Sequence, residues 1–220
     1  QGITIIKPFD APAGMKGYLG KNQDMGVAIY GTPDGKHAIS GYLYNEKGEN
    51  LSEAIFQQQI YAPEGRKLWE KFQAAPAIKE GNPQAKRKIV VFADPFCPYC
   101  KQFRAAAQPW VTAGKVELNT LLVAVMNPQS GRYASAILSA ANPADAWRDY
   151  ELSNGKKLPP FPEKTSKETF DALQHHQHLM DEAGANATPA IYYMNDRQEL
   201  QQVLGMPDTK QLEAMFGPKP

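Results

Sequence analysis

Residues 89–100 read IVVFADPFCPYC, and they contain both cysteines of this 220-residue chain. The apolar, β-branched run that opens the stretch is typical of a strand. Cys97 and Cys100 follow this run, and residues 101–107 (KQFRAAA) favour a helix. Two thiols at this spacing, between a strand and a helix, can close a redox-active disulfide across one helical turn. The stretch therefore predicts a thiol–disulfide site.

The two cysteines are expected to play different parts. If a helix starts near Cys97, its sulfur faces unpaired backbone N–H groups and the positive end of the helix dipole. Both favour a thiolate, so we expect the Cys97 pKa to lie below the free value of about 8.5. Cys100, one turn inside the helix, is expected to be more buried and less acidic. Cys97 is then the attacking nucleophile, and Cys100 resolves the mixed disulfide.

The alternative interpretation of the pair is a metal site. Zinc normally takes four ligands, and the chain has no second cysteine pair. His175, His176 and His178 cluster on a predicted helix, but no carboxylate or cysteine stands at a matching spacing. We predict a solvated helix face there, and no metal. Of the aromatic residues around the cysteines, Tyr99 is expected to be exposed.

Composition limits the class of partner. The chain carries 24 basic and 23 acidic residues, which leaves a net charge of +1 and gives no reason to expect nucleic acid or an acidic membrane. No apolar run approaches the roughly 20 residues that span a bilayer. The abrupt start at Gln1 leads us to expect a processed product from which a signal peptide has been removed.

Residues 1–50 predict a small antiparallel sheet. The turn TPDGK at 32–36 separates two strand-like runs, 25–30 and 37–44, and so predicts a hairpin. A sheet of this size buries little core by itself, so this part needs a partner surface.

Residues 51–82 predict a helical connector. Asn50 and Ser52 are candidate caps, and Pro63 is predicted to open a second helix, because proline is tolerated at the first helical position. Pro76 and the sequence GNP at 81–83 break the pattern.

From residue 87 onward, strands and helices alternate. Strands are predicted at 88–94, 116–125, 189–194 and 200–204, and helices at 131–183 and 208–216. This order indicates a layered α/β sheet with a helical insertion. Pro189 heads an apolar strand, where it is either an edge-strand proline or a cis proline.

The chain resembles the DsbC/DsbG disulfide isomerases of the thioredoxin superfamily. VFADPFCPYCKQF at 91–103 and GANATPAIYYM at 184–194 carry most of the resemblance, supported by GITIIK at 2–7 and KHAISGY at 36–42. It implies an α+β fold with three parts: a cystatin-like dimerisation sheet (1–60), a helical linker (61–84) and a thioredoxin-like catalytic domain with a helical insertion (85–220).

The resemblance also implies the site and its partners. Cys97 and Cys100 would be catalytic, with Pro98 and Tyr99 completing the active-site motif. The family's cis proline maps to Pro189, with Thr188 facing the Cys97 sulfur. The protein would be a periplasmic homodimer without a cofactor that acts as isomerase, reductase and chaperone on cysteine-containing clients. The membrane reductase DsbD would supply its electrons.

One position departs from thioredoxin itself, which keeps a buried carboxylate six residues before its first cysteine. That position is Val91 here, so rapid general reduction by Cys100 is less supported. Two other functions use the same features. The protein could reduce sulfenic acids on single-cysteine proteins such as L,D-transpeptidases, or it could be a holdase chaperone whose thiols are secondary. A DsbA-like oxidase fits less well, since such proteins are usually monomers without the extra N-terminal domain.

Overall fold

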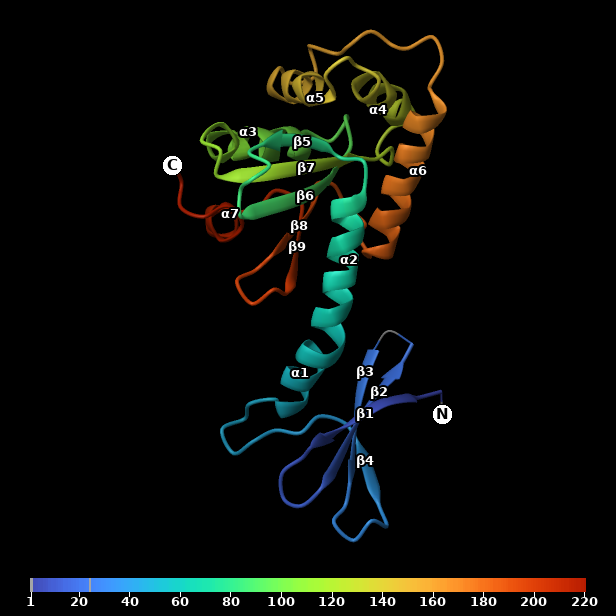
Figure 1. Cartoon of the computed structure of the whole chain (residues 1–220), viewed down its shortest axis with the longest axis vertical. Helices are drawn as coiled ribbons and strands as arrows, with labels where there is room; N and C mark the ends of the chain where they lie inside the picture. Colours follow the sequence, from blue (N-terminus) through green and yellow to red (C-terminus); the bar gives the residue numbers. More distant parts are fainter. Residues whose placement is uncertain (1, 24) are drawn as a thin grey trace. The chain divides into compact units, whose positions relative to one another are not determined.

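The computed structural model describes residues 2–23 and 25–220, and Gln1 and Asp24 lie outside the described residues. The chain divides into two compact units, Gln1–Gly65 and Arg66–Pro220, and each has its own sheet (Figure 1). Within these described residues, none of the helices combines the length and the apolarity needed to cross a bilayer.

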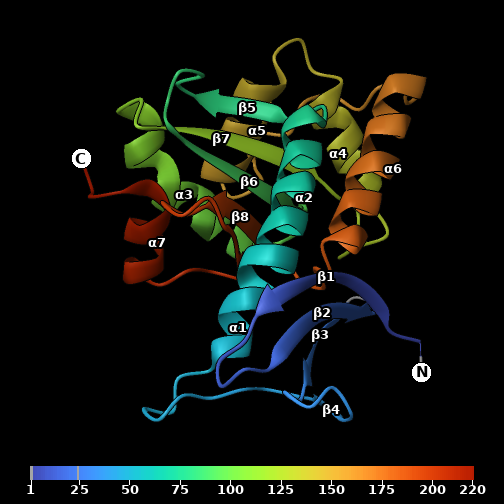
Figure 2. The same ribbon diagram turned by 60° about the horizontal axis from the view of Figure 1, so that its bottom comes forward.

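The N-terminal unit contains an antiparallel sheet whose strands follow chain order (Figure 2). Its strands are β1 (Thr4–Asp10), β2 (Lys16–Asn22), β3 (Met25–Gly31) and β4 (Ala38–Ser40). The predicted hairpin joins β3 to β4, and the Thr32 carbonyl accepts a hydrogen bond from the N–H of Gly35 at 2.9 Å. The predicted small sheet is therefore confirmed, with a final strand shorter than expected.

Helix α1 (Leu51–Phe56) packs on this sheet beside β3. Asn50 caps it by accepting a hydrogen bond from the N–H of Glu53 at 3.0 Å. Gly26 allows the close approach, because a Cβ there would lie 2.8 Å from the Phe56 ring. Ser52 is not a cap: it is buried, and its hydroxyl bonds the Tyr30 hydroxyl at 2.6 Å. The unit's small core consists of Leu19, Ala28, Tyr30, Phe56 and Ile60.

The helical segment continues without a break through a π-helical turn. Residues Gln57–Tyr61 form this turn, η1, and α2 (Ala62–Ala74) follows it directly. A second helix does begin next to Pro63, as predicted, but it is joined to the first. Within η1 the N–H of Ala62 bonds the carbonyl of Gln57, five residues back. This wider turn accommodates the ring and missing N–H of Pro63, which a regular α-helix interior does not tolerate well.

The C-terminal unit contains a five-stranded mixed sheet in the order β5-β7-β6-β8-β9. The central strand β6 (Arg87–Ala93) runs parallel to β7 (Val116–Leu122) and antiparallel to β8 (Ala190–Met194). The edges are β5 (Ile78–Gly81), antiparallel to β7, and β9 (Leu200–Leu204), antiparallel to β8.

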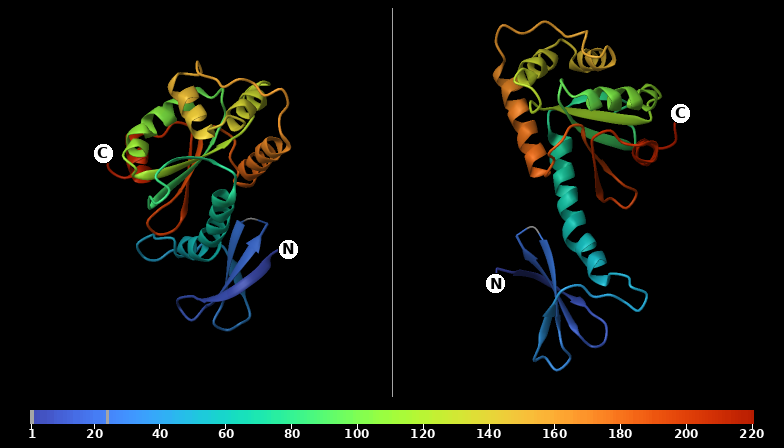
Figure 3. Two further views of the ribbon diagram at one scale, coloured as in Figure 1. Left: turned by 45° about the horizontal axis from the view of Figure 1, so that its top comes forward. Right: turned by 180° about the vertical axis from the view of Figure 1, so that it is seen from behind.

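Alternate residues of β6 face two separate cores. Ile89 and Val91 pack in the cluster formed with α3 (Pro98–Thr112) and α7 (Thr209–Phe216). Val90 and Phe92 face the opposite side, where α6 (Lys167–Glu182) and the end of α2 supply Leu179 and other apolar side chains. Figure 3 shows α6 beside the last turns of α2. Because both faces are covered, the strand is apolar throughout, as its sequence indicated.

The predicted helical insertion is present between β7 and β8. It comprises α4 (Ser130–Leu138), α5 (Pro143–Leu152) and α6. One strand was not predicted: Ile78–Gly81 forms β5 inside residues 61–84, which the sequence assigned to a helical linker. The helix ends at Ala74, two residues before Pro76. A strand of four residues is too short for its alternation to stand out from a loop.

A buried ion pair fastens this edge strand to α3. Arg104 donates from Nε and Nη2 to the two carboxylate oxygens of Glu80, at 3.0 and 2.6 Å. Its Nη1 donates to Gln108 at 2.6 Å. The side chains of Arg104 and Glu80 are only 2% and 6% exposed. The helix that carries the cysteines is thus held to the sheet by a bidentate pair away from water.

Candidate active site

Cys97 is the N-cap residue of α3. Its backbone is extended (φ −78°, ψ 114°), Pro98 occupies the first turn, and the Cys97 Sγ accepts a hydrogen bond from the N–H of Cys100 at 3.2 Å. Proline suits this position because it sets the helical φ and has no N–H to leave unpaired. The sequence order strand, Cys97, Pro98 therefore places a sulfur where a cap acceptor belongs, as predicted.

Hydrogen bonds make Cys97 the acidic thiol. The pKa of Cys97 is lowered to about 6, and the largest cause is a hydrogen bond from the Cys100 side chain. Burial opposes this shift. Hydrogen bonds from Thr188 and from the N–H groups of Cys100 and Tyr99 lower the pKa further. Burial is the first cause that raises the pKa of Cys100, and the neighbouring Cys97 adds to it. The predicted order of acidity is therefore confirmed.

Exposure does not distinguish the two cysteines. Both are free thiols, and Cys97 and Cys100 are 0% and 2% exposed. Cys100 is nevertheless the more deeply buried thiol, as expected, because burial is the largest influence on its pKa but not on that of Cys97.

The Thr188–Pro189 peptide bond is cis, and its loop lies against the cysteine pair. The Cys97 thiol donates to the Thr188 carbonyl at 3.2 Å, and the Thr188 hydroxyl donates to the Met126 sulfur at 3.3 Å. The fold thus brings together segments 91 residues apart in the chain.

Asp94 fixes the loop that leads to Cys97. Its carboxylate is fully buried and accepts four hydrogen bonds of 2.8–3.0 Å, from the N–H groups of Phe96, Val125 and Met126 and from the Ser130 hydroxyl. It therefore ties the cysteine loop to the loop after β7. Sequence reasoning did not single Asp94 out, although a carboxylate directly after a buried strand was a visible signal.

The aromatic residues near the site differ in their exposure to solvent and in their packing. Tyr99 is 54% exposed, as expected, and is free to contact other molecules. Phe96 packs on Tyr133, with ring centroids 4.6 Å apart. Tyr192 is buried in the sheet core, so it serves packing, and Tyr193 is partly buried.

The histidine cluster is only partly solvated. His175 and His178 are exposed, but His176 is fully buried between the Leu122 and Pro76 carbonyls, 2.9 and 3.0 Å from its ring nitrogens. The prediction of a solvated face is therefore wrong for His176, which joins α6 to the end of β7. Within residues 2–23 and 25–220, no three potential metal-ligating side chains gather.

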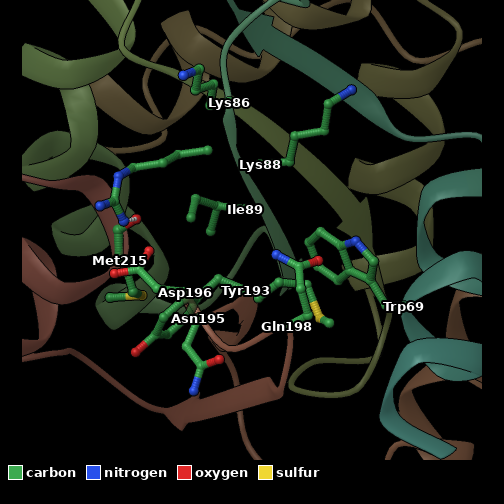
Figure 4. Close-up of a pocket in the computed structure, with 11 residues that line it drawn as sticks. Trp69, Lys86, Lys88, Ile89, Tyr193, Asn195, Asp196, Gln198 and Met215 are labelled. Carbon is green, nitrogen blue, oxygen red and sulfur yellow. Dashed lines mark hydrogen bonds between the residues drawn. The ribbon is translucent and has the colours of Figure 1, made fainter. Parts of the chain in front are cut away.

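A separate cavity of about 390 Å³ lies at the other end of β6. Its lining includes Trp69, Lys86, Lys88 and Tyr193 (Figure 4). Lys86 and Lys88 stand at the start of β6, whereas Cys97 follows the end of this seven-residue strand. A strand of that length spans about 23 Å. The cavity is therefore not part of the thiol site.

The rate of alkylation of reduced protein by iodoacetamide is expected to follow the ionisation of Cys97. The rate at Cys97 should have its midpoint near pH 6 and fall about tenfold per pH unit below it, while Cys100 stays unreactive. Peptide mapping after timed alkylation measures both sites. Cys100→Ala should raise the midpoint, because it removes the largest hydrogen-bond contribution. A midpoint above pH 8 in the unaltered protein would contradict this account.

The same ionisation makes the stability of the reduced protein depend on pH. The folded pKa of Cys97 is lowered from 9.0 to about 6, so the thiolate favours the folded state. This contribution of Cys97 is fully present above pH 9 and is lost as the pH falls through 6.

Comparison with known proteins finds similarity along the whole chain. Residues 1–53 match the disulfide bond isomerase protein N-terminal domain, and residues 74–217 match a thioredoxin-like domain. These matches confirm the predicted fold class. The chain is 56% identical to the thiol:disulfide interchange protein DsbG of Escherichia coli over 219 residues, covering 100% of this chain and 88% of that protein.

One further relative and one solved structure are also similar to the chain. DsbG of Pseudomonas aeruginosa is 37% identical over 223 residues, with 100% of this chain and 86% of that protein covered. A periplasmic thioredoxin-like protein of Salmonella enterica serovar Typhimurium superposes with a TM-score of 0.56 at 19% identity, covering 68% of this chain and 94% of that structure. The last comparison shows the fold alone.

Proposed function

The chain belongs to the DsbC/DsbG family of thiol:disulfide interchange proteins, and from that premise we propose that Cys97 and Cys100 isomerise and reduce disulfides of client proteins in the periplasm. The observation that carries the proposal is the Cys97 sulfur at the N-terminus of α3, stabilised as thiolate by the Cys100 thiol and nearby N–H groups. With a pKa of about 6, roughly nine tenths of Cys97 is thiolate at pH 7.

The first step is common to isomerisation and reduction. The Cys97 thiolate attacks one sulfur of a client disulfide, a bond forms between Cys97 and that sulfur, and the other client sulfur leaves as a thiolate. The Thr188 carbonyl lies 3.2 Å from the attacking Cys97 sulfur, and the Thr188 hydroxyl donates to the Met126 sulfur.

The second step decides between the two outcomes. In isomerisation, another client thiolate attacks the mixed disulfide, a new client disulfide forms, and Cys97 returns as thiolate without net oxidation. In reduction, Cys100 attacks the Cys97 sulfur, the Cys97–Cys100 disulfide forms, and the client leaves reduced. Two electrons must then restore the pair, and we assign their supply to the membrane reductase DsbD.

We also propose that residues 1–60 join two copies of the chain. Strands β1 and β4 are the sheet edges, and each pairs on one side only within the described residues. The unit exposes large apolar side chains that a partner sheet would cover: Ile5 (51%), Ile6 (47%), Met25 (67%) and Ile39 (59%). Light scattering should give twice the chain mass of 24.3 kDa. The mass of a single chain would contradict the dimer.

The function is tested with a client whose several disulfides have been scrambled. In the presence of reduced protein, native activity of the client should return faster than with an equal concentration of a small dithiol. The Cys97→Ala variant is the control and should give only the spontaneous rate. If the unaltered protein does no better than this variant, disulfide isomerisation is not its function.

A further inference from the structure

Glu151 is a buried carboxyl group that the reaction described above does not use. It lies in α5, is 2% exposed, and neither of its carboxylate oxygens has a hydrogen-bond partner among the described residues. A carboxyl group buried in this way costs free energy, and such a cost is usually found where a protein uses the group. Asp94, the other buried carboxylate at this site, is already held by four donors.

The Glu151 carboxyl group lies next to Lys101, in the stripe of α3 that carries both cysteines. Positions 97, 100, 101 and 104 follow helical spacing and so lie on one side of α3. Glu151 raises the pKa of Cys100, and the charges on Cys97, Lys101 and Arg104 in turn affect the pKa of Glu151. The ammonium of Lys101 is 3.7 Å from its Oε1 and also donates to the Pro95 carbonyl at 2.6 Å. The insertion thus places one carboxyl group beside Lys101, the residue that follows Cys100.

The charge states of Glu151 and the cysteines are linked. Burial raises the pKa of Glu151 to about 8. The charge of Lys101 opposes this shift, the Cys97 thiolate adds to it, and the charge of Arg104 lowers the pKa. The Tyr150 hydroxyl, also near Glu151, has a pKa of about 12 and stays protonated. When Cys97 is bonded to a client it no longer carries charge, so Glu151 ionises more readily. The carboxylate is then available when Cys100 must lose its proton.

We propose that Glu151 is the residue that takes up the proton of Cys100 during resolution of the mixed disulfide. The proton moves from the Cys100 thiol to the Glu151 carboxylate while the Cys100 sulfur bonds to the Cys97 sulfur. The bond between Cys97 and the client breaks, and the client sulfur leaves with the electron pair. The cysteine pair is oxidised and the client sulfur is reduced. The role rests on the proposed function and concerns its reductive branch.

The proposed role predicts whether removal of the Glu151 carboxylate slows or speeds the second step. A carboxylate that acted only through its charge would hinder resolution, because the negative charge raises the pKa of Cys100. Its removal would then speed the second step. A proton acceptor has the opposite effect, since its loss slows proton removal, by at least about tenfold for general base catalysis. The sign of the change in rate therefore separates the two roles.

The test uses 5,5′-dithiobis(2-nitrobenzoate) and the reduced full-length protein. Attack by Cys97 releases a first nitrothiobenzoate, and resolution by Cys100 releases a second, so absorbance follows both steps. In Glu151→Gln, the first phase should stay within about threefold of the unaltered protein, and the second should slow at least about tenfold. The pH profile of the second-phase rate should also lose the inflection that the titration of Glu151 produces.

The matched control is Asp149→Asn, on the same helix but at the surface, with its side chain 45% exposed. It should leave both phases and the pH profile unchanged. A second phase in Glu151→Gln that is unchanged or faster, or that keeps its inflection, would overturn the role of Glu151. A first phase that is absent from the unaltered protein would instead overturn the proposed function, and this role with it.

Discussion

Replacing Cys97 by alanine is expected to lower the rate of thiol–disulfide exchange at least about 10³-fold, to the uncatalysed background. Cys97 is the only described residue that combines a cap position, N–H donors and a lowered pKa. Cys100 cannot replace it, because burial raises its pKa and keeps it protonated near neutral pH. The release of nitrothiobenzoate measures the loss.

Cys100→Ala is the matched comparison. It should keep the first step and release one nitrothiobenzoate per chain where the unaltered protein releases two. It should also accumulate mixed disulfides, because the resolving thiol is missing. If Cys97→Ala kept the fast phase while Cys100→Ala lost it, the assignment of nucleophile and resolving thiol would have to be exchanged.

Arg104→Ala is expected to lower the free energy of unfolding by about 3–5 kcal/mol. The substitution leaves the Glu80 carboxylate buried without its bidentate partner, and a buried unpaired charge is much less stable than the same charge in water. It also loosens β5 from α3. Urea unfolding of the reduced protein, followed by circular dichroism, measures the change.

Two controls show whether the loss comes from the orphaned charge. The double variant Glu80→Met with Arg104→Met removes both charges and should recover most of the stability, since buried ion pairs contribute little beyond an apolar replacement. Arg148→Ala breaks pairs with Asp145 and Asp149 whose side chains are 38–54% exposed, and should cost less than 1 kcal/mol. A loss below 1 kcal/mol in Arg104→Ala would contradict the account.

The sequence around the cysteines predicted most of the local structure of the site. Cys97 caps α3 because it stands between an apolar run and a helix-forming stretch. Each of these features acts over only a few residues, so the sequence alone was sufficient to predict the cap. The strand at 200–204 and the helix capped by Asp208 were predicted for the same reason. Local propensity and hydrophobic periodicity are sufficient to predict an element whose conformation depends on its own residues.

Features that depend on distant contacts were missed. Strand β5 is short and gains its stability by pairing with β7, some 40 positions later. Glu151 shares no spacing pattern with Cys100, and only the packing of α5 on α3 brings it beside Lys101, the neighbour of Cys100 in the chain. The absence of a carboxylate at Val91 made rapid general reduction by Cys100 less supported. The fold brings the Glu151 carboxyl group to α3 from another segment.

The most direct test of the central claim is to identify what Cys97 binds. The Cys100→Ala variant is expressed in the periplasm, its mixed disulfides are isolated, and mass spectrometry identifies the attached proteins. The account predicts adducts on Cys97 whose partners contain two or more cysteines, as disulfide isomerisation requires. Partners with a single cysteine each would contradict it and would identify the protein as a reductase of sulfenic acids or their products.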